Sequence, residues 1–152
     1  TKYPQGTKNE INYWRGWAYI FQDDWENASM QFQFCDTAKY LSDFCNEINE
    51  QKYSVEFAKL ASVVIPGAGQ FYTGEYLSGT MSLAWILLTG YLSINSFTEE
   101  RVFDGIITAS LLWMRFYRGN IQNAEQFVIS KNLEITNKAL KSLQFKFNGT
   151  KP

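Results

Sequence analysis

The stretch that decides the fold is residues 62–79, SVVIPGAGQFYTGEYLSG, which separates a polar first half of the chain from an apolar segment. Pro66 stops the helical pattern before it, because proline has no backbone N–H and its ring clashes with the preceding helical turn. Gly67 and Gly69 allow backbone angles and close approaches that a Cβ atom would block. The stretch therefore predicts a sharp hinge into the apolar segment.

A predicted helical hairpin follows the hinge. Residues 76–98 contain no charged side chain, and a bilayer-spanning helix needs roughly 20 residues. Interspersed serines, threonines and an asparagine fit a buried helix of a soluble bundle as well. After a turn at 98–101, the apolar run 105–114 lies between Asp104 and Arg115 and is too short to cross hydrocarbon alone. The hairpin is thus expected to be shallowly inserted in a membrane, held by protein neighbours, or soluble.

In residues 11–65, small and aromatic residues also recur at helical spacing. A glycine, an aromatic residue, an alanine and a second aromatic follow one another at the spacing of a tetratricopeptide repeat. These residues are Gly16, Tyr19, Ala28 and Phe32. An ordinary helical hairpin with an aromatic core explains the same pattern. Either way, this region predicts repeat-like helical hairpins.

The two ends of the chain differ in charge. Residues 1–10 are polar and predict an extended arm. Residues 115–152 carry seven basic and two acidic side chains, and apolar positions recur there at helical spacing. The basic face suits an anionic lipid surface, although an ordinary solvated face explains it too. We predict an all-α protein with an arm (1–10), tetratricopeptide-like helices (11–65), hinge and hairpin (66–118), and a basic amphipathic helix and tail (119–152).

The hinge and hairpin resemble a motif of bacterial envelope proteins, Pro-Gly-x-Gly-Gln-x-Tyr-x-Gly followed by another glycine and an apolar helical hairpin. A largely uncharacterised group of secreted tetratricopeptide-like proteins combines this motif with an aromatic-x-Gly-Asn segment at the exit of the hairpin. The matching residues are Pro66, Gly67, Gly69, Gln70, Tyr72, Gly74, Gly79, Tyr117, Gly119, Asn120 and Ala124. The resemblance implies a role in the bacterial cell envelope. Together with the apolar hairpin, it leads us to expect a membrane-associated protein on the periplasmic side. It implies no known chemistry.

Residues for catalysis and cofactor binding are scarce. The chain has no histidine, the commonest general base and metal ligand. Tyr72 stands where a dinucleotide-binding fingerprint needs its third glycine, and the Gly-Lys-Ser/Thr of a phosphate loop is absent. Asp104 and Arg115 alone make a poor catalytic pair, and no basic stripe with interleaved aromatics predicts nucleic-acid binding. We expect no enzymatic activity, no cofactor, no metal and no nucleic-acid partner.

Cys35 and Cys45 are the only cysteines. Their spacing fits neither a Cys-x-x-Cys redox motif nor a zinc site. On one continuous helix they would lie about 15 Å apart, beyond the reach of a disulfide, whereas a turn near residues 39–43 would let them face each other. A disulfide, which would indicate an oxidising compartment, stays open at this point.

Two further candidate sites have simpler alternatives. Thr37, within Asp36-Thr-Ala, matches a short bacterial O-glycosylation pattern but also suits the start of a helix. Three tryptophans are candidates for an aromatic groove that stacks on a sugar or peptide, or for core packing: Trp14, Trp17 and Trp25.

Two functions from different classes fit these features. The leading hypothesis is a non-enzymatic accessory or scaffold subunit of a larger membrane or outer-membrane protein complex of the envelope, because aromatic residues are abundant and the hairpin is apolar. The alternative is a soluble periplasmic helical module that binds a peptide or glycan.

Overall fold

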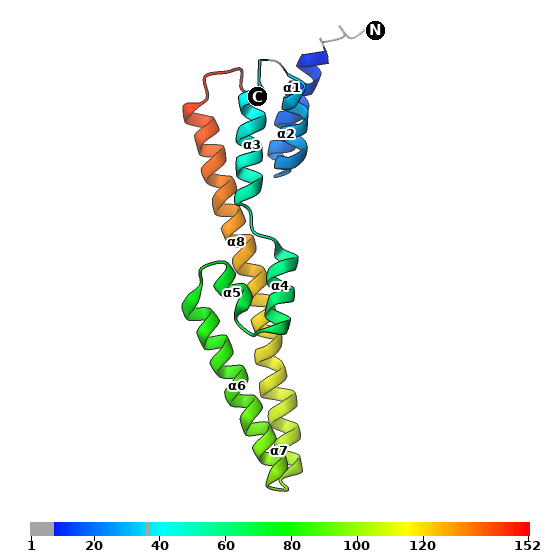
Figure 1. The fold of residues 1–152 in the computed structure, drawn as a ribbon, viewed down its shortest axis with the longest axis vertical. Helices are drawn as coiled ribbons and strands as arrows, with labels where there is room; N and C mark the ends of the chain where they lie inside the picture. Colours follow the sequence, from blue (N-terminus) through cyan, green and yellow to red (C-terminus); the bar gives the residue numbers. More distant parts are fainter. Residues whose placement is uncertain (1–7, 36) are drawn as a thin grey trace. The chain divides into compact units, whose positions relative to one another are not determined.

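The computed structural model describes residues 8–35 and 37–152, and within these ranges every regular element is a helix. The predicted all-α class is therefore confirmed. The chain divides into two compact units (Figure 1): unit 1 joins residues up to Lys52 to residues from Leu133 onward, and unit 2 is Tyr53–Asn132. The sequence placed a boundary at 65/66 instead. The boundary in the structure lies at 52/53, because the helix of residues 55–64 packs on the hinge and therefore belongs to unit 2.

Unit 1 is built from both ends of the chain. Its helices are α1 (Lys8–Phe21), α2 (Trp25–Gln33), α3 (Lys39–Gln51) and the last part of α8 (Met114–Lys146). Figure 1 shows α3 next to this end of α8, with α1 and α2 on the other side of α3. Its core holds Trp17, Ile20, Trp25, Ala28, Phe32, Cys35, Ala38, Leu41, Cys45, Ile48, Ala139, Leu143 and Phe147.

The α1–α2 hairpin depends on one small residue. A Cβ atom on Gly16 would lie 2.6 Å from the ring of Phe32, so only glycine lets the two helices pack at this distance. Ala28 and Phe32 are both fully buried. The contact gives a physical reason for the predicted glycine–aromatic spacing, while membership of the tetratricopeptide class stays a prediction.

Unit 2 contains the hinge and the hairpin. Its elements are α4 (Val55–Val64), α5 (Ala68–Tyr72), α6 (Tyr76–Thr98), α7 (Val102–Ile107), the π-helix η1 (Thr108–Trp113) and the first part of α8. In Figure 1, α6 forms one arm of the hairpin, and α7, η1 and α8 follow without a break as the second arm.

The predicted boundary at 118/119 does not exist. The helix α8 runs straight through Gly119 and Asn120. A single glycine costs a helix interior only about 1 kcal/mol relative to alanine, which neighbouring packing outweighs. The second arm of the hairpin and the predicted basic tail helix are therefore one helix.

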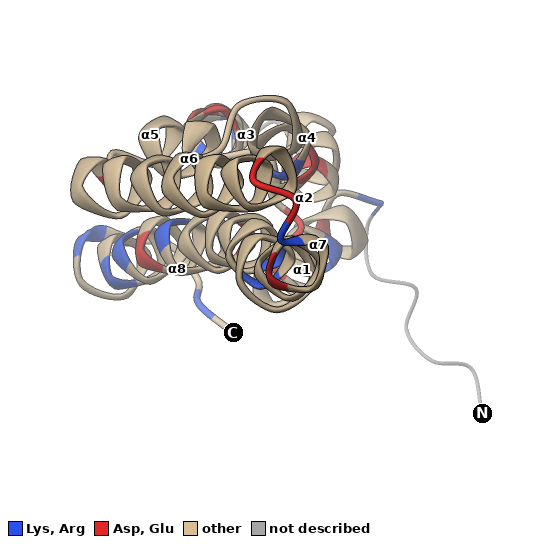
Figure 2. Ribbon diagram, turned by 90° about the horizontal axis from the view of Figure 1, so that it is seen from below, with Lys and Arg blue, Asp and Glu red and all other residues tan. Residues whose placement is uncertain are grey.

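The hairpin exposes apolar side chains along both arms. Among the described residues, α6 is the one helix long and apolar enough to cross a membrane, and only 22% of its most apolar window is buried. Figure 2 shows α6 without a charged position between its ends. Exposed apolar residues include Leu77, Leu87, Tyr91, Ile94, Phe103, Ile106 and Leu111.

Candidate functional site

The hinge motif folds around one asparagine of α8, in a cluster that we call the glycine corner: Ser62, Gly67, Gly69, Gln70 and Asn120. Asn120 is 2% exposed, and its Oδ1 accepts hydrogen bonds from Gly67 N (2.8 Å) and Gln70 Nε2 (3.1 Å). Its Nδ2 donates to the carbonyl of Ser62 (2.9 Å). One side chain therefore connects the end of α4, the turn and α5 to α8.

The turn into α5 explains the Pro-Gly pair. Gly67 has φ 90° and ψ −13°, and Ala68 N donates to Ile65 O at 3.0 Å. Proline followed by a glycine of positive φ is the sequence that a type II turn requires. A Cβ atom on Gly67 would also lie 2.4 Å from the carbonyl oxygen of Gly79. Gly67 is required by its backbone angles and by this close approach.

The next glycine of the motif is required by packing. A Cβ atom on Gly69 would lie 2.5 Å from both Ala124 Cβ and the carbonyl of Ala58. Its N–H donates to Ser62 Oγ at 2.9 Å. The match of Ala124 to the envelope motif therefore has a structural counterpart in the contact between α5 and α8.

Two further glycines define the entry into α6. Gly74 has φ 82° and follows α5, where Glu75 N donates to Gln70 O at 2.8 Å, as in a Schellman motif. A Cβ atom on Gly79 would lie 2.7 Å from the ring of Phe71. The spacing of glycines in the motif thus reflects one tight path of the backbone.

The tyrosines of the motif support the corner from outside. The hydroxyl of Tyr72 accepts a hydrogen bond from Ser54 N (3.2 Å), and its ring lies edge-on to that of Phe57. The hydroxyl of Tyr117 donates to Val63 O (2.8 Å). Gly119 differs from the other glycines, because a Cβ atom there would meet nothing within 4 Å. Of the exit motif, only Tyr117 and Asn120 have contacts that explain them.

One polar atom of the corner has no partner. Gln70 is fully buried, and its Oε1 accepts no hydrogen bond from any described residue. Its Nε2 is bound to the carbonyl of Asn120 (3.0 Å) and lies 3.4 Å from Ser82 Oγ. Exchanging the amide atoms would bring two oxygens together, so this orientation is the favourable one.

A groove of about 970 Å³ lies beside the corner, between the base of α6 and the start of α8; we call it the basic groove. Its α8 side presents Arg115 and Arg118, and its α6 side is largely apolar. Trp85 and Phe116 stack within it, with ring centroids 5.3 Å apart and planes inclined by 7°. The lining of the basic groove includes Leu77, Trp85, Ser110, Leu111, Arg115, Arg118 and Gln122.

Of the two explanations for the tryptophans, core packing holds for Trp17 and Trp25, and the candidate aromatic groove does not form. Trp17 is 4% exposed and Trp25 is 1% exposed, and both belong to the core of unit 1. Only Trp14 is half-exposed. The tryptophans are buried because α3 and the end of α8 cover the aromatic face of the first two helices. The alternative function loses its proposed site.

The disulfide that the sequence left open is not formed. Cys35 and Cys45 are both buried thiols in the core of unit 1, and burial raises the pKa of Cys45 to about 12. Cys35 Sγ donates to the carbonyl of Asn9 at 3.3 Å. Thr37 is exposed between α2 and α3, as a glycan acceptor would be. Asp36, the first residue of that pattern, lies outside the described residues.

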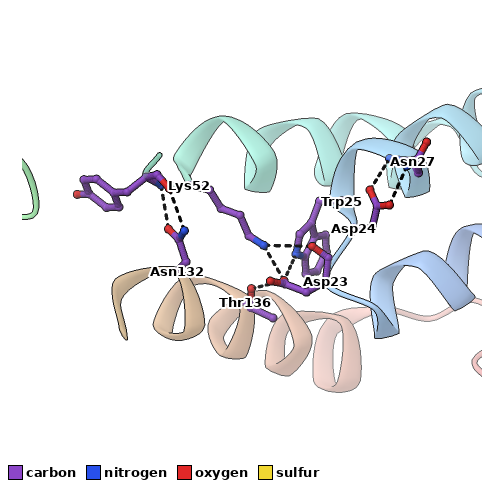
Figure 3. Close-up of polar contacts among 8 residues, drawn as sticks. Asp23, Asp24, Trp25, Asn27, Lys52, Asn132 and Thr136 are labelled. Carbon is purple, nitrogen blue, oxygen red and sulfur yellow. Dashed lines mark hydrogen bonds and ion pairs between the residues drawn. The ribbon is translucent and has the colours of Figure 1, made fainter. Parts of the chain in front are cut away.

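Sequence reasoning missed a polar cluster in unit 1, drawn in Figure 3. Asp23 has φ 62°, and its Oδ1 accepts hydrogen bonds from Trp25 Nε1 (2.7 Å) and Thr136 Oγ1 (2.6 Å) and pairs with Lys52 Nζ (2.7 Å). Burial alone would raise the pKa of Asp23, but the hydrogen bonds and the charge of Lys52 together lower it. No local sequence signal connects Asp23 with Thr136.

The described part of the chain offers few other groups that could bind a metal or take part in catalysis. Within residues 8–35 and 37–152, no group of three or more acidic or thiol side chains is placed to hold a metal ion. Asp104 pairs with Arg101 at the hairpin tip (3.5 Å), while Arg115 lines the basic groove. Comparison with family models, with curated proteins and with solved structures found no match.

Proposed function

We propose that the protein is a non-enzymatic accessory or scaffold subunit that attaches to a membrane of the bacterial cell envelope through its apolar hairpin. The observation that carries this proposal is the exposure of apolar side chains on both arms. On α6, Leu77, Leu87 and Ile94 are 77%, 62% and 66% exposed. Soluble monomers rarely expose contiguous apolar patches larger than a few hundred Å².

The hairpin also satisfies its own backbone. Both arms are helical, so their backbone hydrogen bonds are made within the chain, as hydrocarbon demands. The uncharged length of α6, 23 residues, corresponds to about 34 Å at about 1.5 Å per residue. This length suits a hydrocarbon core of about 30 Å.

The glycine corner gives the hairpin a rigid base. Buried, mutually bonded polar groups favour one arrangement, because any rearrangement would leave them unsatisfied. In unit 2 this fixes the angle at which α6 leaves α5 relative to α8. A rigid base supports the proposed scaffold function, in which the hairpin holds the chain at the membrane and the helical units bind a larger protein complex of the envelope.

Vesicle flotation tests the proposal with a matched pair of variants. Leu87→Arg places a charge on the exposed face of α6, and Phe145→Arg places one on an even more exposed position of unit 1, where Phe145 is 76% exposed. An arginine in a membrane-embedded helix costs about 3 kcal/mol, so Leu87→Arg should lower vesicle binding roughly 100-fold. Phe145→Arg should leave it unchanged.

Co-purification from native membranes then tests the scaffold function. Wild-type protein should retain a stable protein partner after detergent extraction, and Leu87→Arg should lose it. A wild-type protein that stays monomeric without detergent and does not float with vesicles would contradict the proposal. The soluble periplasmic module would then be the better explanation.

A further inference from the structure

We propose that the basic groove binds one anionic phospholipid, with its phosphate between Arg115 and Arg118 and an acyl chain along the base of α6. The inference rests on the proposed membrane attachment and goes beyond it, because it assigns a specific ligand to a specific site. All groove residues belong to unit 2.

The two arms of the hairpin differ in apolar length. The arm α6 is uncharged for about 34 Å, whereas the second arm rises only about 16 Å from Asp104 before it reaches Arg115. When α6 spans a hydrocarbon core of about 30 Å, roughly half of its length therefore lies opposite the part of the second arm that carries Arg115 and Arg118. Arginines at such depth need a polar partner, and a phospholipid headgroup drawn into the groove supplies one.

The charges of the groove favour an anion. Neither Arg115 nor Arg118 makes an ion pair with another described residue. Glu75 also lines the groove, but its carboxylate pairs with Lys131 at 3.4 Å. A guanidinium group binds a phosphate through two parallel hydrogen bonds, which gives geometric selectivity in addition to charge.

The two walls of the groove match an amphipathic ligand. On the α6 side, Leu77 and Trp85 offer apolar contact to an acyl chain. On the α8 side, Gln122 adds a polar group next to the arginines. Trp85 stacks on Phe116, and both rings line the groove, so an acyl chain would meet aromatic as well as aliphatic surface.

The backbone at the groove is unusual. The π-helix η1 ends at Trp113, directly before the two arginines of α8. Such π-helical segments are rare and often occur at functional sites. Here η1 contributes Ser110 and Leu111 to the groove, so the irregular backbone and the arginines belong to the same site.

The test measures flotation of the full chain with phosphatidylcholine vesicles and with vesicles that also contain phosphatidylglycerol. Wild-type protein should prefer the anionic vesicles, and Arg115→Gln/Arg118→Gln should lose about 10- to 30-fold of binding to them while it keeps its binding to neutral vesicles. The matched control Lys138→Gln/Lys141→Gln removes two charges from unit 1 and should change binding by less than about threefold.

A second measurement separates a specific site from general charge attraction. Native mass spectrometry of detergent-purified wild-type protein should show one retained phosphatidylglycerol per chain, and the double glutamine variant should show none. Arg115→Lys/Arg118→Lys keeps both charges but not the paired hydrogen bonds, so its retained lipid should fall while vesicle binding persists. Equal retention in the lysine and wild-type proteins would contradict phosphate recognition by the guanidinium groups.

The two proposals fail in different ways. Equal binding of wild-type protein to neutral and anionic vesicles would overturn the lipid site and leave membrane attachment intact. Equal losses of binding to anionic vesicles in Arg115→Gln/Arg118→Gln and in Lys138→Gln/Lys141→Gln would also overturn the site. The preference would then depend only on total charge. Absence of flotation with either vesicle would overturn both proposals.

Discussion

Asn120 Oδ1 accepts a 2.8 Å hydrogen bond from the backbone N–H of Gly67, which lies 53 positions earlier in the chain. Both residues are buried, so water cannot replace the bond if it is lost. The same amide also binds Ser62 and Gln70. The stability of unit 2 should therefore depend strongly on this single side chain.

Replacement of Asn120 tests this dependence. Asn120→Leu keeps the approximate size but leaves buried partners unsatisfied, so the free energy of unfolding should fall by about 2–4 kcal/mol. Asn120→Asp keeps the acceptor for Gly67 and loses only the donor to Ser62, although it buries a carboxyl group. The exposed Gln126→Leu on the same helix is the control, and denaturant titration is the measurement. Equal stability of Asn120→Leu and Gln126→Leu would disprove the role of Asn120.

The glycines of the motif should respond differently to alanine. Gly67→Ala and Gly69→Ala should each cost about 2 kcal/mol or more, since one introduces strain at positive φ and both place a Cβ within 2.5 Å of other atoms. Gly119→Ala should raise stability by about 0.5–1 kcal/mol, because helical alanine loses less entropy and meets no neighbour. Thermal unfolding of the three variants checks the order. A loss of stability in Gly119→Ala comparable to that in Gly69→Ala would contradict the packing explanation.

Acid should weaken the cluster around Asp23. The folded state lowers the pKa of Asp23, so its contribution to stability is fully present above the ordinary pKa of about 3.9. It is lost as the pH falls through the lowered value. Asp23→Asn, which tolerates positive φ, should therefore be less stable than wild type at pH 7, by less than about 1 kcal/mol because Asp23 is half-exposed.

The stability difference between the two proteins should shrink as the pH approaches 2. Urea titrations at several pH values, with Asp24→Asn as the neighbouring control, measure this difference. A difference that stays constant with pH would show that the charge of Asp23 is irrelevant and that only its hydrogen bonds stabilise unit 1.

Local chemistry explains why the hinge and hairpin were predictable. Pro66 and Gly67 determine the turn through their own backbone preferences, and the absence of charge over residues 76–98 matches α6 residue for residue. Such signals depend only on neighbouring positions. The continuation of α8 through Gly119 was not predictable in the same way, because a glycine–asparagine pair also ends helices.

Other features could not be predicted, because they depend on contacts between segments that are distant in the sequence. The aromatic stripe of α1 and α2 suits either a groove or a core, and only the packing of Ala139, Leu143 and Phe147 against it decides for the core. Asp23 and Thr136 meet across 113 positions without any sequence signal. The envelope resemblance singled out Asn120 but not Ser62, whose role becomes visible only where α4 meets α5 and α8.

The division of α8 between the two units sets the order in which the chain can fold on the ribosome. The core of unit 1 needs Ala139, Leu143 and Phe147, which are translated after α1, α2, α3 and the whole hairpin. The residues of unit 2 are complete once Asn132 has been made. The residues of the hairpin and the glycine corner can therefore pack into unit 2 while the first helices still lack the last helix of their own core.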